Sequence, residues 1–154
     1  MDFVLVLHTH LPYVLGHGRW PHGSDWLMEG ALDSYLPLLD RLEALHGEGV
    51  PAPVTIGMTP VLGAQLAAPG FAGELRAFIA QRLAACDDAE RELTTTGESA
   101  LVPVVHFWRG RYRHSLSQFN ALDGDLIGAL RALEGDGRIE LMSSAATHGF
   151  LPLL

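Results

Sequence analysis

The chain has 154 residues and is 48% hydrophobic, which is enough for one globular domain with a sizeable core. Its formal net charge of −8 argues against a nucleic-acid partner, because phosphate binding needs a cationic surface. The short apolar run near the N-terminus is neither a signal peptide nor a membrane span, and the single cysteine, Cys86, has no partner for an internal disulfide. We therefore expect a cytoplasmic protein without a membrane partner.

Three short apolar segments predict buried β-strands. They are residues 3–7, Val54–Met58 and residues 139–142. Continuous apolar runs of this length are typical of strands that are covered on both faces, as in parallel sheets.

A leucine repeat predicts a helix after the first strand. Its members are Leu32, Leu36, Leu39, Leu42 and Leu45. Gly47 and Gly49 follow the repeat and predict the end of the helix. Pro37 falls inside the repeat, so we expect a kink or a restart of the helix there.

Further helical patterns lie between the second and third strands. Thr59 and Pro60 predict an N-cap and the first residue of a helix. The next apolar face consists of Leu75, Phe78, Ile79 and Leu83. Ser115 and Gln118 predict a capping box for a last helix that ends at the turn EGDGR. The apolar residues of that helix are Phe119, Leu122, Leu126, Leu130 and Leu133.

The order of these elements indicates an α/β fold. Strands that alternate with helices are usually parallel and joined by right-handed crossovers. Three strands make a thin sheet, and three of the last four residues are leucines, so we expect the chain to be the front part of a larger fold. Such a partial sheet exposes strand edges, which predicts self-association or marginal stability of the isolated chain.

Polar side chains follow each strand at the end where parallel α/β folds place their functional groups. His8 and His10 follow the first strand, and Thr59 follows the second. The third strand is followed by Ser143, Ser144, Thr147 and His148. We therefore expect three histidines to meet at one rim of the sheet.

Two functional interpretations of His8, His10 and His148 remain open from the residues alone. Three imidazoles with an open fourth position suit a catalytic zinc ion, as in a metal-dependent hydrolase. Alternatively, they form hydrogen bonds to a polar substrate such as a sugar. A single histidine of this kind could instead only satisfy a backbone carbonyl.

Two other segments contain aromatic residues. Residues 16–23 form a glycine-rich loop that does not fit a dinucleotide-binding turn, and its Trp20 either stacks on sugar rings or covers the core. Residues 106–114, HFWRGRYRH, mix arginine with aromatic rings, and we interpret them as a solvated helix face with contacts between residues four apart.

The motifs HTHLPYV (residues 8–14) and GRIELMSSAATHGFLPLL (residues 137–154) resemble two signature regions of glycoside hydrolase family 57. The intervening WPHGSDWLMEGALDSYLPLL and VTIGMTPVLGAQL resemble the 1,4-α-glucan branching enzymes of that family. The resemblance implies that residues 1–154 supply the first three strands of an incomplete (β/α)7 barrel. It also implies that the partner is an α-glucan.

The resemblance assigns substrate-binding roles to four residues. His10 would face the donor sugar subsite with His8 beside it, and His148 would lie on the same rim. Trp20 lies in a loop that borders the glucan cleft in similar enzymes.

The chemistry implied is retaining transfer by a glutamate nucleophile and an aspartate acid/base, without a metal or other cofactor. The resemblance places both carboxylates in later signature regions, beyond Leu154, so no catalytic residue matches within this chain. The chain is then an inert N-terminal portion of a branching enzyme. The alternatives are a metal-dependent hydrolase and a non-catalytic glucan-binding module, and the residues do not separate branching from hydrolysis or 4-α-glucan transfer.

Overall fold

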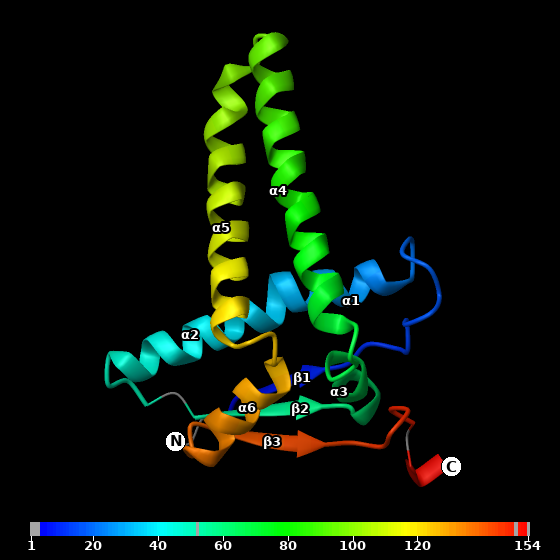
Figure 1. The fold of residues 1–154 in the computed structure, drawn as a ribbon. Coiled ribbons are helices and arrows are strands. Elements are labelled where there is room, and N and C mark those ends of the chain that lie inside the picture. Colours follow the sequence, from blue (N-terminus) through cyan, green and yellow to red (C-terminus); the bar gives the residue numbers. More distant parts are fainter. Residues whose placement is uncertain (1–3, 52, 150, 154) are drawn as a thin grey trace.

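The structure is a computed structural model that describes residues 4–51, 53–149 and 151–153. Its strands form one parallel sheet in the order β1-β2-β3 (Figure 1). The bounds of the strands are β1 Val6–Thr9, β2 Val54–Met58 and β3 Ile139–Ser143. In the register of the sheet, His8 lies opposite Gly57, which lies opposite Met142. The predicted parallel arrangement is confirmed.

The first strand differs from its prediction in position and in burial. It begins at Val6 and includes His8, whereas residue 3 of the predicted strand lies outside the described residues. Val6 is 49% exposed, so the expectation of burial on both faces is wrong. The reason is that β1 lies at an edge of the described sheet, and the helices of the chain cover one face only.

All the main helices lie on the same side of the sheet (Figure 1). Their bounds are α1 Ser24–Gly30, α2 Leu36–Gly47, α3 Pro60–Leu66, α4 Phe71–Thr95, α5 Val102–Ala121 and α6 Leu126–Gly135. Three short helical segments are η1 Ala31–Tyr35, η2 Ser99–Leu101 and η3 Leu151–Leu153. The long helices α4 and α5 form an antiparallel hairpin that extends away from the sheet.

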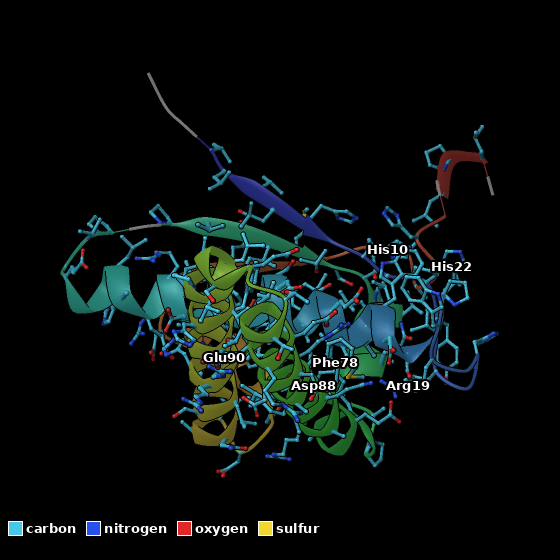
Figure 2. All side chains as sticks on the ribbon, turned by 90° about the horizontal axis from the view of Figure 1, so that it is seen from above. His10, Arg19, His22, Phe78, Asp88 and Glu90 are labelled. Carbon is cyan, nitrogen blue, oxygen red and sulfur yellow. The ribbon has the colours of Figure 1, made fainter. Side chains whose placement is uncertain are left out.

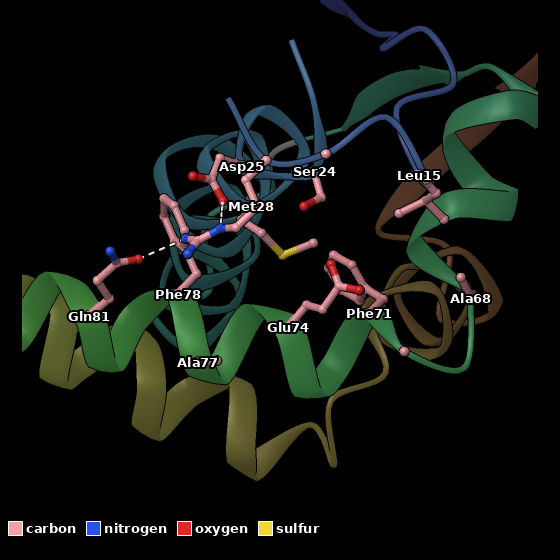
Figure 3. Close-up of a pocket in the computed structure, with 14 residues that line it drawn as sticks. Leu15, Ser24, Asp25, Met28, Ala68, Phe71, Glu74, Ala77, Phe78 and Gln81 are labelled. Carbon is pink, nitrogen blue, oxygen red and sulfur yellow. Dashed lines mark hydrogen bonds and ion pairs between the residues drawn. The ribbon is translucent and has the colours of Figure 1, made fainter. Parts of the chain in front are cut away.

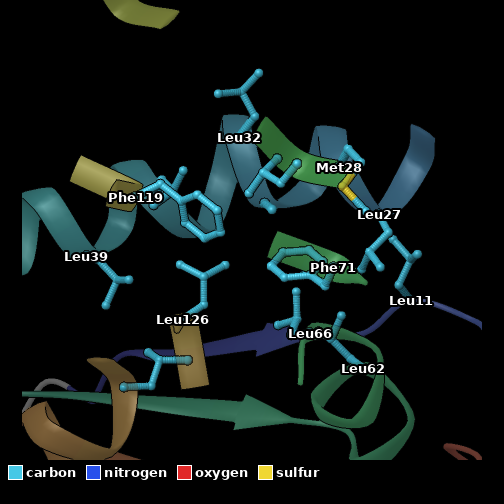
Figure 4. Close-up of a cluster of buried hydrophobic side chains, with 14 of the residues drawn as sticks. Leu11, Leu27, Met28, Leu32, Leu39, Leu62, Leu66, Phe71, Phe119 and Leu126 are labelled. Carbon is cyan, nitrogen blue, oxygen red and sulfur yellow. The ribbon is translucent and has the colours of Figure 1, made fainter. Parts of the chain in front are cut away.

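The hydrophobic core fills the space between the sheet and the helices (Figure 4). Phe71 of α4 and Phe119 of α5 meet edge to face with their ring centroids 6.1 Å apart. Leu27 of α1 and Leu126 of α6 are also fully buried in this cluster. Each such side chain contributes about 1.5–3 kcal/mol through burial, so the base of the hairpin is firmly attached to the sheet.

The helix around Pro37 is continuous but changes its winding. A π-helical turn, η1, directly precedes α2, and Pro37 lies in the first turn of α2. Proline has no N–H to donate to the preceding turn, and the π-helical winding of η1 lies where that hydrogen bond is missing. Gln118 of α5 donates a hydrogen bond from Nε2 to the Leu36 carbonyl at 2.9 Å, which ties this irregular segment to the hairpin.

The predicted cap of α3 is confirmed. Thr59 is fully buried, and its Oγ1 accepts a hydrogen bond from the Leu62 N–H at 3.4 Å. The predicted capping box at Ser115 and Gln118 is wrong, because both residues lie inside α5. The apolar spacing that suggested one helix runs across two helices, and α6 is capped by Asp125, which accepts from the Gly128 N–H at 2.7 Å.

The helical face of residues 106–114 makes contacts that the sequence pattern does not indicate. His106 and Arg109 of α5 both bind the carboxylate of Glu90 on α4, at 2.9 and 2.5 Å. These hydrogen bonds, first from His106 and then from Arg109, hold the pKa of Glu90 below its ordinary value. The segment therefore pairs with the neighbouring helix.

No helix within the described ranges is long and apolar enough to span a membrane.

Candidate functional site

The candidate site begins with His8, which β1 directs to the face of the sheet that the helices leave open. A Cβ atom on Gly57 would lie 3.3 Å from Nδ1 of His8 and 3.6 Å from Cε of Met142. Glycine on the central strand therefore leaves room for the His8 ring between its two neighbours. The strand alternation that buries Leu7 towards the helices is what turns His8 away from them.

His148 approaches His8 from the turn that follows β3. The two Nε2 atoms are 2.8 Å apart, and the ring centroids of His10 and His148 are 4.4 Å apart. The backbone of His148 is left-handed, with a φ of 61°, and its N–H donates to the Ala145 carbonyl at 2.9 Å. The expectation that the three histidines meet at one rim is confirmed by these distances.

The contact between His8 and His148 also constrains their protonation. One Nε2 must carry the proton and the other must accept it, so at least one of the two rings is neutral. Desolvation, and then the nearby His148 and His8, lower the pKa of His10 from its ordinary value of 6.5. The three rings therefore form a cluster joined by a hydrogen bond, in which the neutral form of His10 is favoured.

His10 is positioned by the residue that caps α3. Its Nδ1 lies 3.1 Å from Oγ1 of Thr59, the buried side chain at the end of β2. The same hydroxyl thus connects the helix start to the imidazole cluster. Thr59 is one of the predicted rim residues, and in the structure its hydroxyl group both contacts His10 and caps α3.

The other predicted rim residues, Ser143, Ser144 and Thr147, show no contact with the three histidines among the described hydrogen bonds. The hydroxyl groups of Ser143 and Ser144 lie against the carbonyl groups of Ser144 and Ala145, at 3.5 and 3.2 Å. Thr147 is exposed in the turn before His148. In the described part of the chain, His148 is the residue of this segment that joins the histidine cluster.

Trp20 is 76% exposed, so the alternative that it covers the core is wrong. The loop that carries it leaves β1 at the carboxyl end of the sheet, the end at which His10 also lies (Figures 1 and 2). An indole exposed at this end of the sheet is available to stack on a ligand.

Sequence reasoning missed two polar residues that hold the segment after His10. Gln65 of α3 is fully buried, accepts from the Val14 N–H at 2.7 Å, and donates to the Pro12 carbonyl at 3.0 Å. Arg19 lines a cavity of about 620 Å³ between the loop, α1 and α4 (Figure 3). Neither residue has a local sequence signal, because these hydrogen bonds of Gln65 join residues more than 50 positions apart and the place of Arg19 in the cavity wall depends on the loop.

The metal interpretation finds no support in the arrangement of side chains. No group of three His, Cys, Asp or Glu residues in the described ranges is placed so that it could hold a metal ion.

The two catalytic carboxylates that the resemblance implies would follow Leu154 in the sequence. Leu154 itself lies outside the described residues. The location of the nucleophile and the acid/base beyond Leu154 therefore stays a prediction.

Comparison with known proteins places this geometry in a family. The model of glycosyl hydrolase family 57 matches residues 4–154. A 1,4-alpha-glucan branching enzyme from Thermococcus kodakarensis is 38% identical over 149 residues, which cover 97% of this chain and 21% of that enzyme. The crystal structure of a branching enzyme of this family from Pyrococcus horikoshii has a TM-score of 0.90 at 39% identity, covering 98% of this chain and 28% of the other.

A third likeness concerns the fold alone. The alpha-amylase AmyC from Thermotoga maritima has a TM-score of 0.85 at 24% identity, covering 97% of this chain and 28% of that one. The chain therefore spans between about a fifth and three tenths of the proteins it matches, as an N-terminal portion of them. Its parallel strands and intervening helices correspond to part of a (β/α)7 barrel, as predicted. The chain belongs to glycosyl hydrolase family 57.

Proposed function

We propose that this chain forms part of the glucan-binding cleft of an α-1,4-glucan branching enzyme. The observation that carries the proposal is the meeting of His8, His10 and His148 at the carboxyl end of the sheet. Imidazole nitrogens donate and accept hydrogen bonds, which suits the hydroxyl groups of an uncharged sugar. The similarity to branching enzymes at 38–39% identity selects α-glucans among such ligands.

The chain binds substrate in this proposal but does not perform the transfer. Retaining transfer needs two carboxyl groups about 5–5.5 Å apart, one as nucleophile and one as acid/base. Two acidic residues of α1, next to the Trp20 loop, form ion pairs with arginine. Asp25 binds Arg19 at 2.8 Å, and Glu29 binds Arg82 at 3.0 Å. The reacting pair comes from the part of the enzyme that follows the matched portion.

An amylose assay with iodine staining tests the inert-portion proposal. We expect the 154-residue chain to leave the colour of the amylose–iodine complex unchanged, with a complete branching enzyme as positive control. Robust branching or hydrolysis by the chain alone would refute it.

Electrophoresis through gels that contain glycogen tests the glucan-binding role. The chain should be retarded, and His10→Ala or Trp20→Ala should reduce the retardation. His46→Ala, in the last turn of α2, is the matched control and should migrate like the unchanged chain. A mobility that glycogen does not alter would contradict the proposal.

The setting that accompanies this function is the synthesis of glycogen in the cytoplasm. The edges of the sheet support a further proposal of self-association, because β1 and β3 lie at the two edges of the described sheet. Light scattering should therefore show species larger than a monomer. A monodisperse monomer across micromolar concentrations would count against self-association but not against glucan binding.

A further inference from the structure

The loop of residues 16–23 has a compact backbone that is closed at its base. The Ser24 N–H donates to the Gly18 carbonyl at 2.9 Å, and the Asp25 N–H donates to the Arg19 carbonyl at 3.2 Å. A Cβ atom on Gly23 would lie 2.1 Å from the Gly18 oxygen, so this close approach requires glycine. The backbone thus forms a definite frame for Trp20.

Trp20 has little other support. Its side chain is 76% exposed, so the position of the indole depends on the loop and not on packing against the core. The neighbouring indole, Trp26, is 42% exposed and lies against His22, with ring centroids 5.5 Å apart. Whatever fixes the loop therefore fixes the backbone from which the Trp20 side chain projects.

Arg19 joins the loop to two separate helices. Its Nε donates to Oδ1 of Asp25 on α1 at 2.8 Å, and its Nη2 donates to Oε1 of Gln81 on α4 at 2.7 Å (Figure 3). The Asp25 side chain is only 17% exposed, so its end of the pair is well fixed. A planar guanidinium binds both partners at once, which the single ammonium of lysine does not reproduce.

We propose that Arg19 is a positioning residue for Trp20. By bridging α1 and α4, it holds the loop in the conformation that presents the indole to a glucan chain, without itself contacting the sugar. This inference rests on the proposed glucan-binding function, and it adds a residue through which the helical hairpin supports the cleft. The two hydrogen bonds of Arg19 on which this inference rests both join residues of this chain.

Fluorine NMR of the chain labelled with 5-fluorotryptophan tests the positioning directly. The three tryptophans give three signals, which Trp→Phe variants assign. We expect Arg19→Ala to move the Trp20 signal towards that of free 5-fluorotryptophan and to leave the Trp108 signal in place. Arg91→Ala, which removes an exposed pair with Asp88 within α4, is the matched control and should leave all three signals unchanged.

Glycogen affinity is the second measurement. Arg19→Ala should weaken binding roughly twofold to tenfold, the factor that corresponds to the cost of immobilising one side chain on binding. Arg19→Lys, which keeps a charge for Asp25 but not the double bridge, should lie between Arg19→Ala and the unchanged chain. The unmoved Trp108 signal serves as the check that the variants are folded.

The two readouts separate failure of this inference from failure of the proposed function. A Trp20 signal that Arg19→Ala does not move overturns the positioning role, even if the affinity falls. If the unchanged chain fails to bind glycogen at all, the proposed function is refuted, while the NMR signal still reports whether Arg19 holds the loop.

Discussion

The two faces of the sheet are built by the same alternation of side chains but have opposite environments. On the face towards the helices, Val54, Ile56 and Ile139 are between 1% and 9% exposed. On the open face, Val6 and Met142 are about half exposed, beside His8. The covered face holds the fold together, and the open face carries the candidate site. Substitutions on the two faces should therefore separate stability from binding.

The largest effect is expected on the covered face. Ile56→Ala should lower the free energy of unfolding by about 2–5 kcal/mol, because it leaves a cavity in the centre of the core. Urea denaturation measures the loss. A loss below about 1 kcal/mol would mean that the described core does not hold the sheet.

One substitution made on both faces sharpens the comparison. Val54→Thr buries a hydroxyl group on the covered face and should cost about 1–3 kcal/mol. Val6→Thr places the same group at a half-exposed position and should change stability by about 0.5 kcal/mol or less. Equal losses at the two positions in thermal or urea melts would show that both faces are covered in solution.

Thr59 connects the two faces, because it caps α3 and also touches His10. Thr59→Ala should cost about 0.5–2 kcal/mol through the lost cap. It should also change the titration of His10, which NMR follows, because the hydroxyl at 3.1 Å is removed. Thr59→Ser is the control that keeps the hydroxyl group. It should retain most of the stability of the unchanged chain and a similar titration of His10.

The pH dependence should be the smallest effect. Because the pKa of His10 is lowered in the folded chain, the unfolded chain binds more protons just below pH 6.5. The contribution of His10 to stability is therefore intact above pH 6.5, falls as the pH drops through the lowered pKa, and then levels off. Comparing urea melts of the unchanged chain and of His10→Gln at about pH 8 and about pH 5 isolates this contribution. If His10→Gln loses as much stability as the unchanged chain between these two pH values, His10 does not cause the loss.

The sequence predicted those features that local patterns or strand order determine. The second strand was found at Val54–Met58, because it is apolar and lies between prolines. The meeting of His8 with His148 followed from the rule that parallel strands end at the same edge. Thr59 was identified as a cap because proline follows it directly.

Features that depend on long-range contacts were not predictable in this way. The exposure of β1 follows from which helices cover the sheet, and an apolar run does not reveal that. Ser115 and Gln118 match a capping box locally, but the hairpin continues α5 through them. The burial of Gln65 depends on a backbone segment 51 residues away in sequence, so a glutamine in a helix gave no signal of its role.

We propose that His8, His10 and His148 together form one site that binds an α-glucan. Titration of the chain with maltoheptaose, followed by NMR of the nitrogen-15-labelled histidine rings, tests it most directly. We expect the signals of these three rings to shift together, while those of His46, His106 and His114 on the helices remain unchanged. Signals at the rim that do not move, or shifts confined to the helical histidines, would contradict the account.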